Sequence, residues 1–273
     1  MTIKPLCAVT QEQLISAFNE AFSDYILPLK LTSELWEARA KRDRIDLSVS
    51  YGYFDNDILA GFIFQGAAPG KWYNAGTGVI PAHRGRNITK QIYSHILAKA
   101  PEHQIKELSL EVITTNAPAI KIYKDTGLNI LRELVCFKGT VSLQNTSSVT
   151  VKESTDYNWD ILKTFWEYPP TWQLNQDAVN ATKDSCVFAQ AFENGVLCGY
   201  IIYNHFTKLV MQFGAKKENR AEILTALFKY IQDKYPAEIT INNVDSRAEQ
   251  DLAFFKNSGF KETIRQYAMA KNL

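Results

Sequence analysis

The sequence GVIPAHRGRNITK at residues 78–90, followed by NAPAIKIYKDTG at residues 116–127, decides how this chain folds. An extended segment ends near Val79, a loop rich in basic side chains and backbone N–H groups follows, and a helix with an apolar face begins near Ile88. Free N–H groups at the start of a helix and the positive end of its dipole both attract anions. The pattern therefore predicts a strand, a loop and a helix that together bind a pyrophosphate group.

The chain also contains a duplicated pattern. FDNDILAGFIF at residues 54–64 matches FENGVLCGYII at 192–202, an offset of 138 residues. Farther on, ITTNAPAIKIYKDTGL at 113–128 lies over DSRAEQDLAFFKNSGF at 245–260, at an offset of 132 residues. Two related domains explain these matches. The alternative is two unrelated α/β patterns that share hairpins and glycine-terminated helices.

The smaller offset also lays RGRNIT at 84–89 on KKENRA at 216–221. The offset falls by six residues between the two matches, which predicts a deletion in the second copy. We place this deletion near the equivalent of Gly66 to Trp72, in a hairpin loop, because loops tolerate such changes.

Each copy is expected to be an α/β (α+β) domain, and the stretch SLQNTSSVTV at 142–151 has the polar composition of a solvated connector. The domains are therefore placed at residues 1–144 and 145–273. In the first, Thr10 and Gln13 have the spacing of a capping box. Further helices are expected after Thr32, near Ile88 and around Pro118 to Gly127, and strands are expected in SVSYGYF, ILAGFIF, Trp72–Val79, Leu108–Val112 and about Leu131–Val141.

Composition limits the classes of function. The chain has 30 Lys+Arg and 29 Asp+Glu, a net charge of +1, which argues against a broad nucleic-acid interface. Its four cysteines form no CxxC or Cys/His metal spacing, so no metal is expected. The N-terminus has no apolar signal core, and no apolar run is long enough to cross a bilayer. We expect a cytoplasmic protein that binds no nucleic acid and no membrane.

Residues 78–89 and 116–127 resemble the acyl-CoA loop and following helix of the GNAT superfamily of N-acyltransferases. The resemblance covers most of residues 1–141, with a weaker echo in 150–273. It implies two tandem GNAT-like domains, each a mixed, mostly antiparallel, splayed sheet flanked by helices. Acetyl-CoA would bind in the gap beside the strand that ends at Val79, where a backbone N–H would meet the developing oxyanion.

The GNAT signature Gln/Arg-x-x-Gly-x-Gly/Ala falls on Arg84, Asn87 and Thr89, so two of its three positions depart from the usual residue. Asn87 is expected to adopt a positive φ and to start the helix, since asparagine tolerates both roles. Thr89 brings a methyl group near the pyrophosphate, although its hydroxyl can donate to a phosphate. The alternative is a solvated basic loop without a ligand. The resemblance assigns cofactor binding to Val79, Arg84, Gly85, Arg86, Asn87, Ile88, Thr89 and Asn116.

Catalysis by such a site needs an acid and a base. The resemblance makes the Tyr123 hydroxyl the acid that protonates the departing CoA thiolate, and makes the Asn116 side chain a partner of the pantetheine amides. The alternatives are a core aromatic residue and a helix cap. An amine of pKa about 10.4 must lose a proton before it attacks. Glu111 is the first candidate base and Asp24 the second; the alternatives are an ordinary exposed strand carboxylate and a turn residue.

The second copy differs where chemistry is expected. It has Lys216-Lys217-Glu218 in place of Arg84-Gly85-Arg86, and Ala248, Phe255 and Asn243 in place of Asn116, Tyr123 and Glu111. We therefore expect residues 145–273 to be a degenerate domain that binds no acyl-CoA catalytically and is structural or walls the acceptor cleft. The aromatic residues of FWEYPPTW at 165–172 would line that wall or form a buried interdomain core.

The leading hypothesis is an acetyl-CoA-dependent N-acetyltransferase that transfers an acetyl group to a primary amine by direct attack in the N-terminal domain. The acceptor would be a small-molecule or peptide amine, and the protein a monomer or homodimer. The alternatives are a non-catalytic CoA- or protein-binding module and a tandem aminoacyl-transferase that uses charged tRNA.

Overall fold

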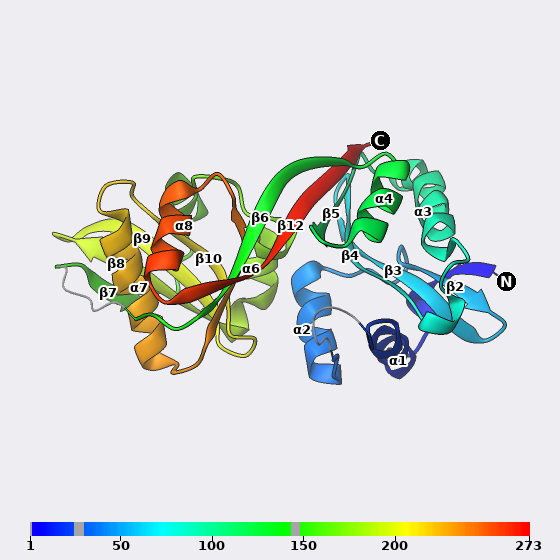
Figure 1. Cartoon of the computed structure of the whole chain (residues 1–273). Helices are drawn as coiled ribbons and strands as arrows, with labels where there is room; N and C mark the ends of the chain where they lie inside the picture. The colour runs from blue at the N-terminus through cyan, green and yellow to red at the C-terminus, as the bar shows by residue number, and fades with distance from the viewer. Residues whose placement is uncertain (1, 25–29, 143–147) are drawn as a thin grey trace. The chain divides into compact units, whose positions relative to one another are not determined.

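The computed structural model describes residues 2–24, 30–142 and 148–273. It contains two compact units, the first formed by Met1–Leu131 with Ala268–Leu273 and the second by Arg132–Tyr267. Figure 1 labels the helices and strands along the chain. Each unit has a mixed, mostly antiparallel sheet with helices packed on it, which confirms the expected fold class.

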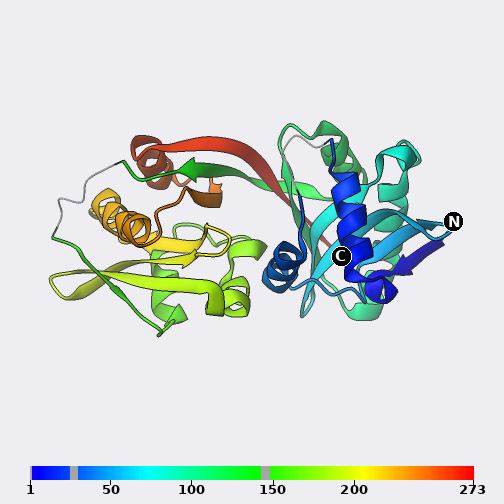
Figure 2. The same ribbon diagram turned by 90° about the horizontal axis from the view of Figure 1, so that it is seen from below.

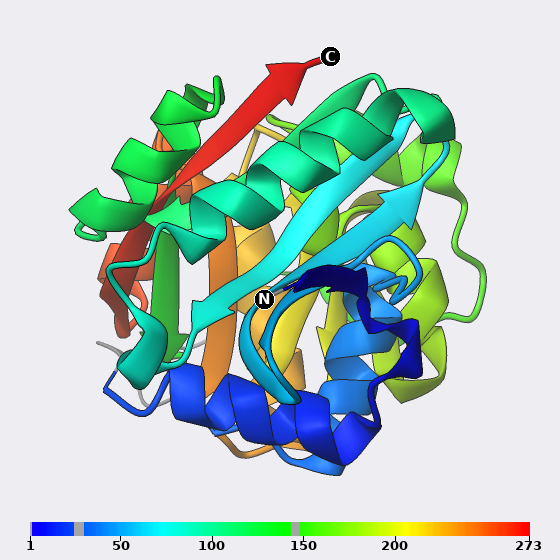
Figure 3. The ribbon, with the colours of Figure 1, turned by 90° about the vertical axis from the view of Figure 1, so that its right-hand side faces the viewer.

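The strands of the first unit lie in the order β1-β2-β3-β4-β5, and the end of β12 follows β5. Leu273 N–H donates to the carbonyl of Lys106 at 2.9 Å and fixes this chain end. Figure 3 shows α3 lying across β3 and β4. The elements are β1 (Thr2–Pro5), α1 (Gln11–Ala21), α2 (Ser33–Asp43), β2 (Tyr51–Asp55), β3 (Ile58–Ala68), β4 (Lys71–Val79), α3 (Ile88–Lys99), β5 (Glu107–Ile113) and α4 (Ala117–Asp125), with short 3-10 turns at Leu6–Ala8, Pro81–His83 and Ala100–His103.

Local sequence signals set these boundaries. Thr10 and Gln13 form the expected capping box at the start of α1, because each side chain satisfies the other residue's backbone N–H. Thr32 caps α2 by accepting from the N–H of Leu35. Gly127, with φ of 91°, ends the α4 segment, a backbone conformation in which glycine carries no steric penalty.

Strands β4 and β5 pair over a short stretch and then separate. They are parallel and in register only at Lys71↔Glu107, Trp72↔Leu108 and Tyr73↔Ser109. A bulge in β4 follows at once, because Phe64 pairs with Gly76 and Gln65 with Asn74. A bulge bends its strand away from its neighbour. The sheet therefore splays beyond Tyr73, as the resemblance of the sequence to the GNAT superfamily implied.

The second unit repeats this plan. From the start of β12, its strand order is β12-β6-β11-β10-β9-β8-β7, and β10 pairs in parallel with β11 only at Leu209↔Thr240 and Val210↔Ile241 before a bulge follows in β10. Figure 2 shows α7 and α8 on one face of this sheet. The elements are β6 (Asn129–Gly139), β7 (Thr150–Glu153), α5 (Trp159–Leu162), α6 (Gln176–Thr182), β8 (Cys186–Glu193), β9 (Val196–Asn204), β10 (Leu209–Ala215), α7 (Arg220–Lys234), β11 (Ile239–Asp245), α8 (Glu249–Asn257) and β12 (Phe260–Asn272), with 3-10 turns at Lys163–Phe165, Trp172–Leu174 and Lys183–Ser185.

The division between the units differs from the sequence expectation. The sequence placed it between residues 144 and 145, whereas the compact units meet at Leu131 and Arg132 and the last six residues fall in the first unit. The reason is strand pairing. β6 pairs with β11 through Phe137↔Ile241 and Val135↔Val244, so most of this strand belongs to the second unit.

The length difference between the copies also lies elsewhere than expected. Gly61 pairs with Val79 in the first unit, and its counterpart Gly199 pairs with Ala215 in the second. These hairpins span 79 − 61 = 18 and 215 − 199 = 16 positions, so only two of the missing residues lie there. The following loop has eight residues, 80–87, in the first unit and four, 216–219, in the second. The expected hairpin deletion is thus only partly correct: two of the six residues are missing from the hairpin, and four are missing from the loop that precedes the helix.

Candidate active site

The loop between β4 and α3 has the backbone geometry that the sequence indicates. Gly85 and Asn87 have φ of 78° and 56°, and α3 begins directly after Asn87. The positive φ expected of Asn87 is therefore confirmed, although its side chain makes no capping hydrogen bond. Among the described residues, a β-carbon placed on Gly85 would meet nothing within 4 Å, so the described part of the structure leaves open space beside the loop.

Backbone N–H groups of this loop are free to bind an anion. Among the described residues, no acceptor is found for the N–H groups of residues 85–90; the first helical bond is from Gln91 N–H to the Asn87 carbonyl at 3.0 Å. Ile88 is buried, and Thr89 is half-buried at the start of α3. These donors and the positive helix end fit a pyrophosphate, with contacts from the backbone.

The basic side chains of the loop already have partners. The Arg84 guanidinium binds Asp24 through two contacts of 2.6 and 2.8 Å, and it also donates to the carbonyls of Ala21 and Val79. The hydrogen bond from Arg84 lowers the pKa of Asp24 below its usual value. Arg86 Nη1 lies 3.5 Å from an Asp55 carboxylate oxygen. Arg84 therefore anchors the loop to the end of α1.

Glu111 is not an isolated carboxylate. It lies half-buried on β5 and accepts a hydrogen bond from the hydroxyl of Tyr73, which lies on β4. Burial, together with the Glu111 charge, raises the pKa of Tyr73 well above its ordinary value, so this hydroxyl remains a donor. The exposed-carboxylate alternative for Glu111 does not describe this environment.

A buried cluster on α2 surrounds this pair. Asp43 is fully buried and takes two hydrogen bonds from Arg42, at 2.6 and 3.0 Å. Arg39 Nε lies 3.6 Å from Asp43, and Arg39 Nη2 donates to the carbonyl of Ala75, at the bulge of β4. Arg42 also acts electrostatically on Tyr73 and Glu111. No sequence motif pointed to Arg39, Arg42, Asp43 or Tyr73 as site residues; the i, i+4 spacing of Arg39 and Asp43 was the available signal.

Tyr123 and Asn116 both lie on the α4 segment. Asn116 caps the helix, its Oδ1 accepting from the N–H of Ala119 at 3.3 Å. Tyr123 is 7% exposed, and its ring meets that of Tyr93 edge to face at a centroid distance of 5.5 Å. Asn116 is therefore a helix cap and Tyr123 a buried aromatic residue, as the alternatives for these two residues stated. That either residue also contacts a cofactor stays a prediction.

Glu111, the candidate base, and Tyr123, the candidate acid, lie on opposite faces of the splayed sheet. Tyr73 and Asn74 alternate along β4, so their side chains lie on opposite faces of the sheet. Tyr73 contacts Glu111 on the α2 face, whereas the Asn74 amide contacts the Tyr93 hydroxyl of α3, beside Tyr123. This arrangement can serve a reaction in which a base and an acid act on opposite sides of a substrate that lies in the gap.

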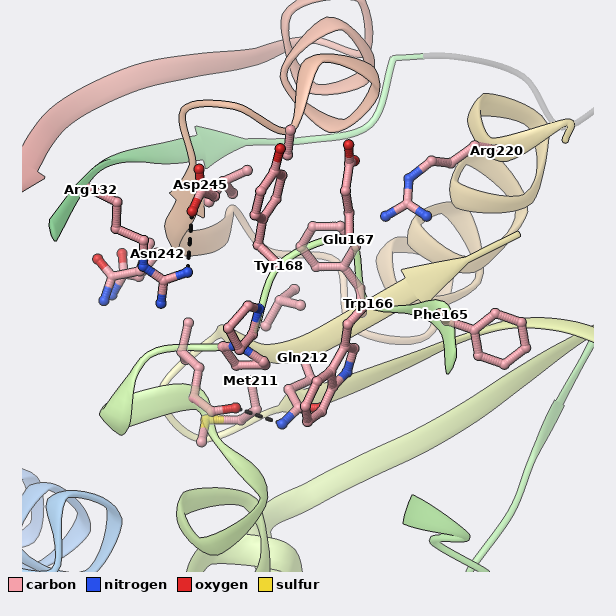
Figure 4. A pocket seen from close by; sticks show the side chains of 18 residues that line it. Arg132, Phe165, Trp166, Glu167, Tyr168, Met211, Gln212, Arg220, Asn242 and Asp245 are labelled. Carbon is pink, nitrogen blue, oxygen red and sulfur yellow. Dashed lines mark hydrogen bonds and ion pairs between the residues drawn. The ribbon is translucent and has the colours of Figure 1, made fainter. Parts of the chain in front are cut away.

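The second unit lacks these features. Asn219 has φ of 55° before α7, like Asn87, but the loop ahead of it is four residues shorter. Phe255, at the place of Tyr123, is fully buried. Trp166 and Tyr168, from the aromatic stretch that the sequence assigned to a cleft wall or an interdomain core, line a cavity within this unit (Figure 4).

The described residues contain no group of three or more His, Cys, Asp and Glu side chains that could hold a metal ion. None of their helices is long and apolar enough to span a membrane.

The model of the acetyltransferase (GNAT) family matches residues 12–128. No curated protein has a sequence that matches this chain. The fold is similar to that of a GCN5-related N-acetyltransferase from Sphaerobacter thermophilus, with a TM-score of 0.71, 13% identity and coverage of 95% of this chain and 91% of that one. A putative acetyltransferase from Pyrococcus horikoshii has a TM-score of 0.70 and 13% identity, with coverage of 96% and 85%.

A tandem GNAT protein from the clavulanic acid biosynthesis pathway covers nearly the whole of both chains. Its TM-score is 0.67 at 13% identity, over 99% of this chain and 98% of that one. Residues 12–128 therefore match the GNAT acetyltransferase family, and the chain as a whole has the fold of tandem GNAT proteins.

Proposed function

We propose that the protein is an acetyl-CoA-dependent N-acetyltransferase with one working site, in the first unit, and that its acceptor is a primary amine of a small molecule or peptide. One observation carries the proposal: the N–H groups of residues 85–90, which have no acceptor among the described residues, lie at the start of α3, beside the end of β4 where the sheet splays. The family domain at residues 12–128 contains this whole region.

Acetyl-CoA would supply the activated acetyl group, and the chain would bind it and move protons. The N–H groups of residues 85–90 would hold the pyrophosphate, which explains why Asn87 and Thr89 can replace glycine in the family signature: backbone donors do not depend on side-chain identity. Thr89 adds a hydroxyl and a methyl group to this surface, so it affects affinity more than the existence of the site.

Glu111 is the base we favour for the acceptor amine. Its carboxylate is held by the Tyr73 hydroxyl near Arg42, so its orientation is fixed on β5. Asp24 is less suited, because its bond to Arg84 lowers its pKa and weakens it as a base. Tyr123 would return a proton to the leaving thiolate from the opposite face of the sheet.

Titration calorimetry with CoA and a thiol-release assay test the proposal. We expect one CoA per chain and acetyl-CoA-dependent thiol release with at least one member of a primary-amine library. Gly85→Val places a side chain beside the loop at a positive φ and should weaken CoA binding by tenfold or more. Gly195→Val is the matched control: it makes the same change in the second unit, at a φ of 76°, and should affect CoA binding less.

Different outcomes separate the competing functions. Binding of one CoA without turnover of any amine would leave a CoA-binding module in place of an enzyme. Binding of aminoacyl-tRNA without CoA binding would favour the aminoacyl-transferase alternative. Equal effects of Gly85→Val and Gly195→Val would contradict a site at the loop before α3.

A further inference from the structure

The second unit contains a cavity where its own sheet splays. Strands β10 and β11 separate after Val210↔Ile241, and the segment between α5 and α6 borders the resulting space. The cavity is open to solvent on one side. Figure 4 shows Trp166 and Tyr168 on one side, Met211 and Gln212 below them and Arg132 and Asn242 on another side. All of its lining residues belong to the second unit.

Most of the wall is apolar or aromatic. Trp166, Tyr168, Met211, Phe213 and Val244 contribute to it. The indole N–H of Trp166 donates to the Tyr200 hydroxyl at 2.6 Å, so this ring is fixed and presents its carbon surface. A space bounded in this way suits the hydrocarbon or aromatic body of a small molecule.

Several polar side chains in the wall already form hydrogen bonds with other groups of the protein. Gln212 accepts from the Tyr200 hydroxyl at 2.9 Å and donates to the Leu174 carbonyl at 2.6 Å. Asn243 donates to Thr171 at 3.1 Å and accepts from Gln266 at 2.8 Å. These groups set the shape of the cavity and have little capacity left for a ligand.

Arg220 is committed as well. It binds Asp251 through two contacts of 2.6 and 3.0 Å and also donates to the Ala215 carbonyl at the end of β10. Its side chain is 6% exposed and that of Asp251 is 8% exposed, so the ion pair is buried and its two charges cancel. The loop of residues 216–219 is four residues shorter than its counterpart and contains Glu218, which disfavours a pyrophosphate.

Arg132 and Asn242, unlike these groups, still have N–H groups that could bind a ligand. Among the described residues, only Nη1 of Arg132 has an acceptor, Asp245 Oδ2 at 3.2 Å, and the half-buried Asn242 amide has no hydrogen-bond partner. Asp245 also receives Nε and Nη2 of Arg247, both at 2.8 Å, so two guanidinium groups share one carboxylate and the cluster carries one net positive charge. In Figure 4 the exposed Glu167 carboxylate lies beyond Tyr168 as seen from Arg132.

We propose that this cavity is a second ligand site, which binds a small aryl or alkyl carboxylate. The carboxylate would take the remaining N–H groups of Arg132 and the amide of Asn242, and the apolar body would lie against Trp166, Met211 and Phe213. Residue 242 corresponds to Leu110 in the first copy, so the amide distinguishes the two units at this position.

The test uses the full chain without acetyl-CoA, so that it does not depend on the proposed acetyl transfer. Isothermal titration would compare 3-phenylpropanoate with its neutral amide and with phenethylamine. We expect the carboxylate to bind, and the amide and the amine to bind at least about tenfold more weakly, because only the carboxylate pairs with Arg132.

Variants locate the site. Arg132→Gln, Asn242→Asp and Asn242→Leu should each raise the Kd of 3-phenylpropanoate about tenfold or more. Asn242→Leu guards against misfolding, since leucine is the residue of the first copy. Arg265→Gln is the matched control: this arginine also binds acidic partners in the second unit but does not line the cavity, and its loss should leave the Kd within about twofold.

Three results would overturn the inference. The first is the absence of heat and of ligand NMR saturation transfer with 3-phenylpropanoate at 10 mM, a concentration at which even a weak specific site would be occupied. The second is equal binding of the carboxylate and its amide. The third is binding that folded Asn242→Asp and Arg132→Gln variants leave unchanged.

Discussion

Arg84 and Asp24 form a bidentate ion pair, with Nη1–Oδ2 at 2.6 Å and Nη2–Oδ1 at 2.8 Å. The same guanidinium donates to the carbonyls of Ala21 at 3.0 Å and Val79 at 3.2 Å. Arg84 thus joins the end of α1 to the end of β4 and sets where the loop of residues 80–87 begins. Asp24 holds this side chain and neutralises one positive charge beside the proposed pyrophosphate site.

Asp24→Asn should tighten CoA binding and leave turnover nearly unchanged. The substitution removes a negative charge beside the loop, while the bonds from Arg84 to Ala21 and Val79 remain, so we expect the Kd of CoA to fall about twofold to fivefold at low salt and less at high salt. Titration calorimetry at two salt concentrations measures this. Asp57→Asn, in an exposed turn, is the control for charge alone. A hundredfold loss of kcat in Asp24→Asn would instead make Asp24 the base.

Glu111→Gln should lower kcat by about 10² to 10⁴ at neutral pH if Glu111 is the general base. Tyr73→Phe keeps the carboxylate but removes its hydrogen bond, so we expect a smaller loss, about tenfold, and a shifted pH profile. Steady-state kinetics between pH 6 and 9 measure both effects. Ser109→Ala changes a neighbouring half-buried position on β5 and should be neutral. An unchanged pH profile in Glu111→Gln would exclude this role.

Backbone features of the site were predictable from local sequence. Each of these features depends on neighbouring residues: the loop from Val79, the positive φ of Asn87, the caps at Thr10 and Thr32, and the glycine at the end of α4. Such signals act within a few positions along the chain, so a single sequence contains them.

Side-chain partnerships across elements were not predictable in this way. Tyr73 and Glu111 are 38 positions apart, and Arg84 and Asp24 are 60 apart, so only the fold brings them together. Most of the deletion was misplaced for a related reason. Sequence offsets count the missing residues, but only the pairing of Gly61 with Val79 and of Gly199 with Ala215 shows which loop is shorter.

Tyr123→Phe should lower kcat with little change in the Kd of CoA, because the ring keeps its contact with Tyr93 while the proton donor is lost. We expect a loss of about 10² if the hydroxyl protonates the leaving thiolate. Tyr93→Phe is the matched control, a buried tyrosine whose hydroxyl contacts Asn74; it should lower stability by about 1 kcal/mol and affect kcat less. Thiol-release kinetics and thermal unfolding give both values. Equal kcat losses in the two variants would argue for packing at Tyr123.

Asp245→Asn should make the acid dependence of stability shallower. Burial by itself would raise the pKa of Asp245, but hydrogen bonds from Arg247 and Arg132 outweigh it and hold the pKa below the ordinary value. A carboxylate with a depressed folded pKa stabilises the fold above its unfolded pKa, about 3.9, and loses that contribution as the pH falls through the folded pKa. The variant should therefore be less stable than wild type by about 1 to 2 kcal/mol at pH 7, and this difference should shrink below about pH 4. Urea unfolding between pH 3 and 8 measures it, with the exposed Asp156→Asn as control. A difference that stays constant down to pH 3 would mean that Asp245 acts through packing and not through its charge.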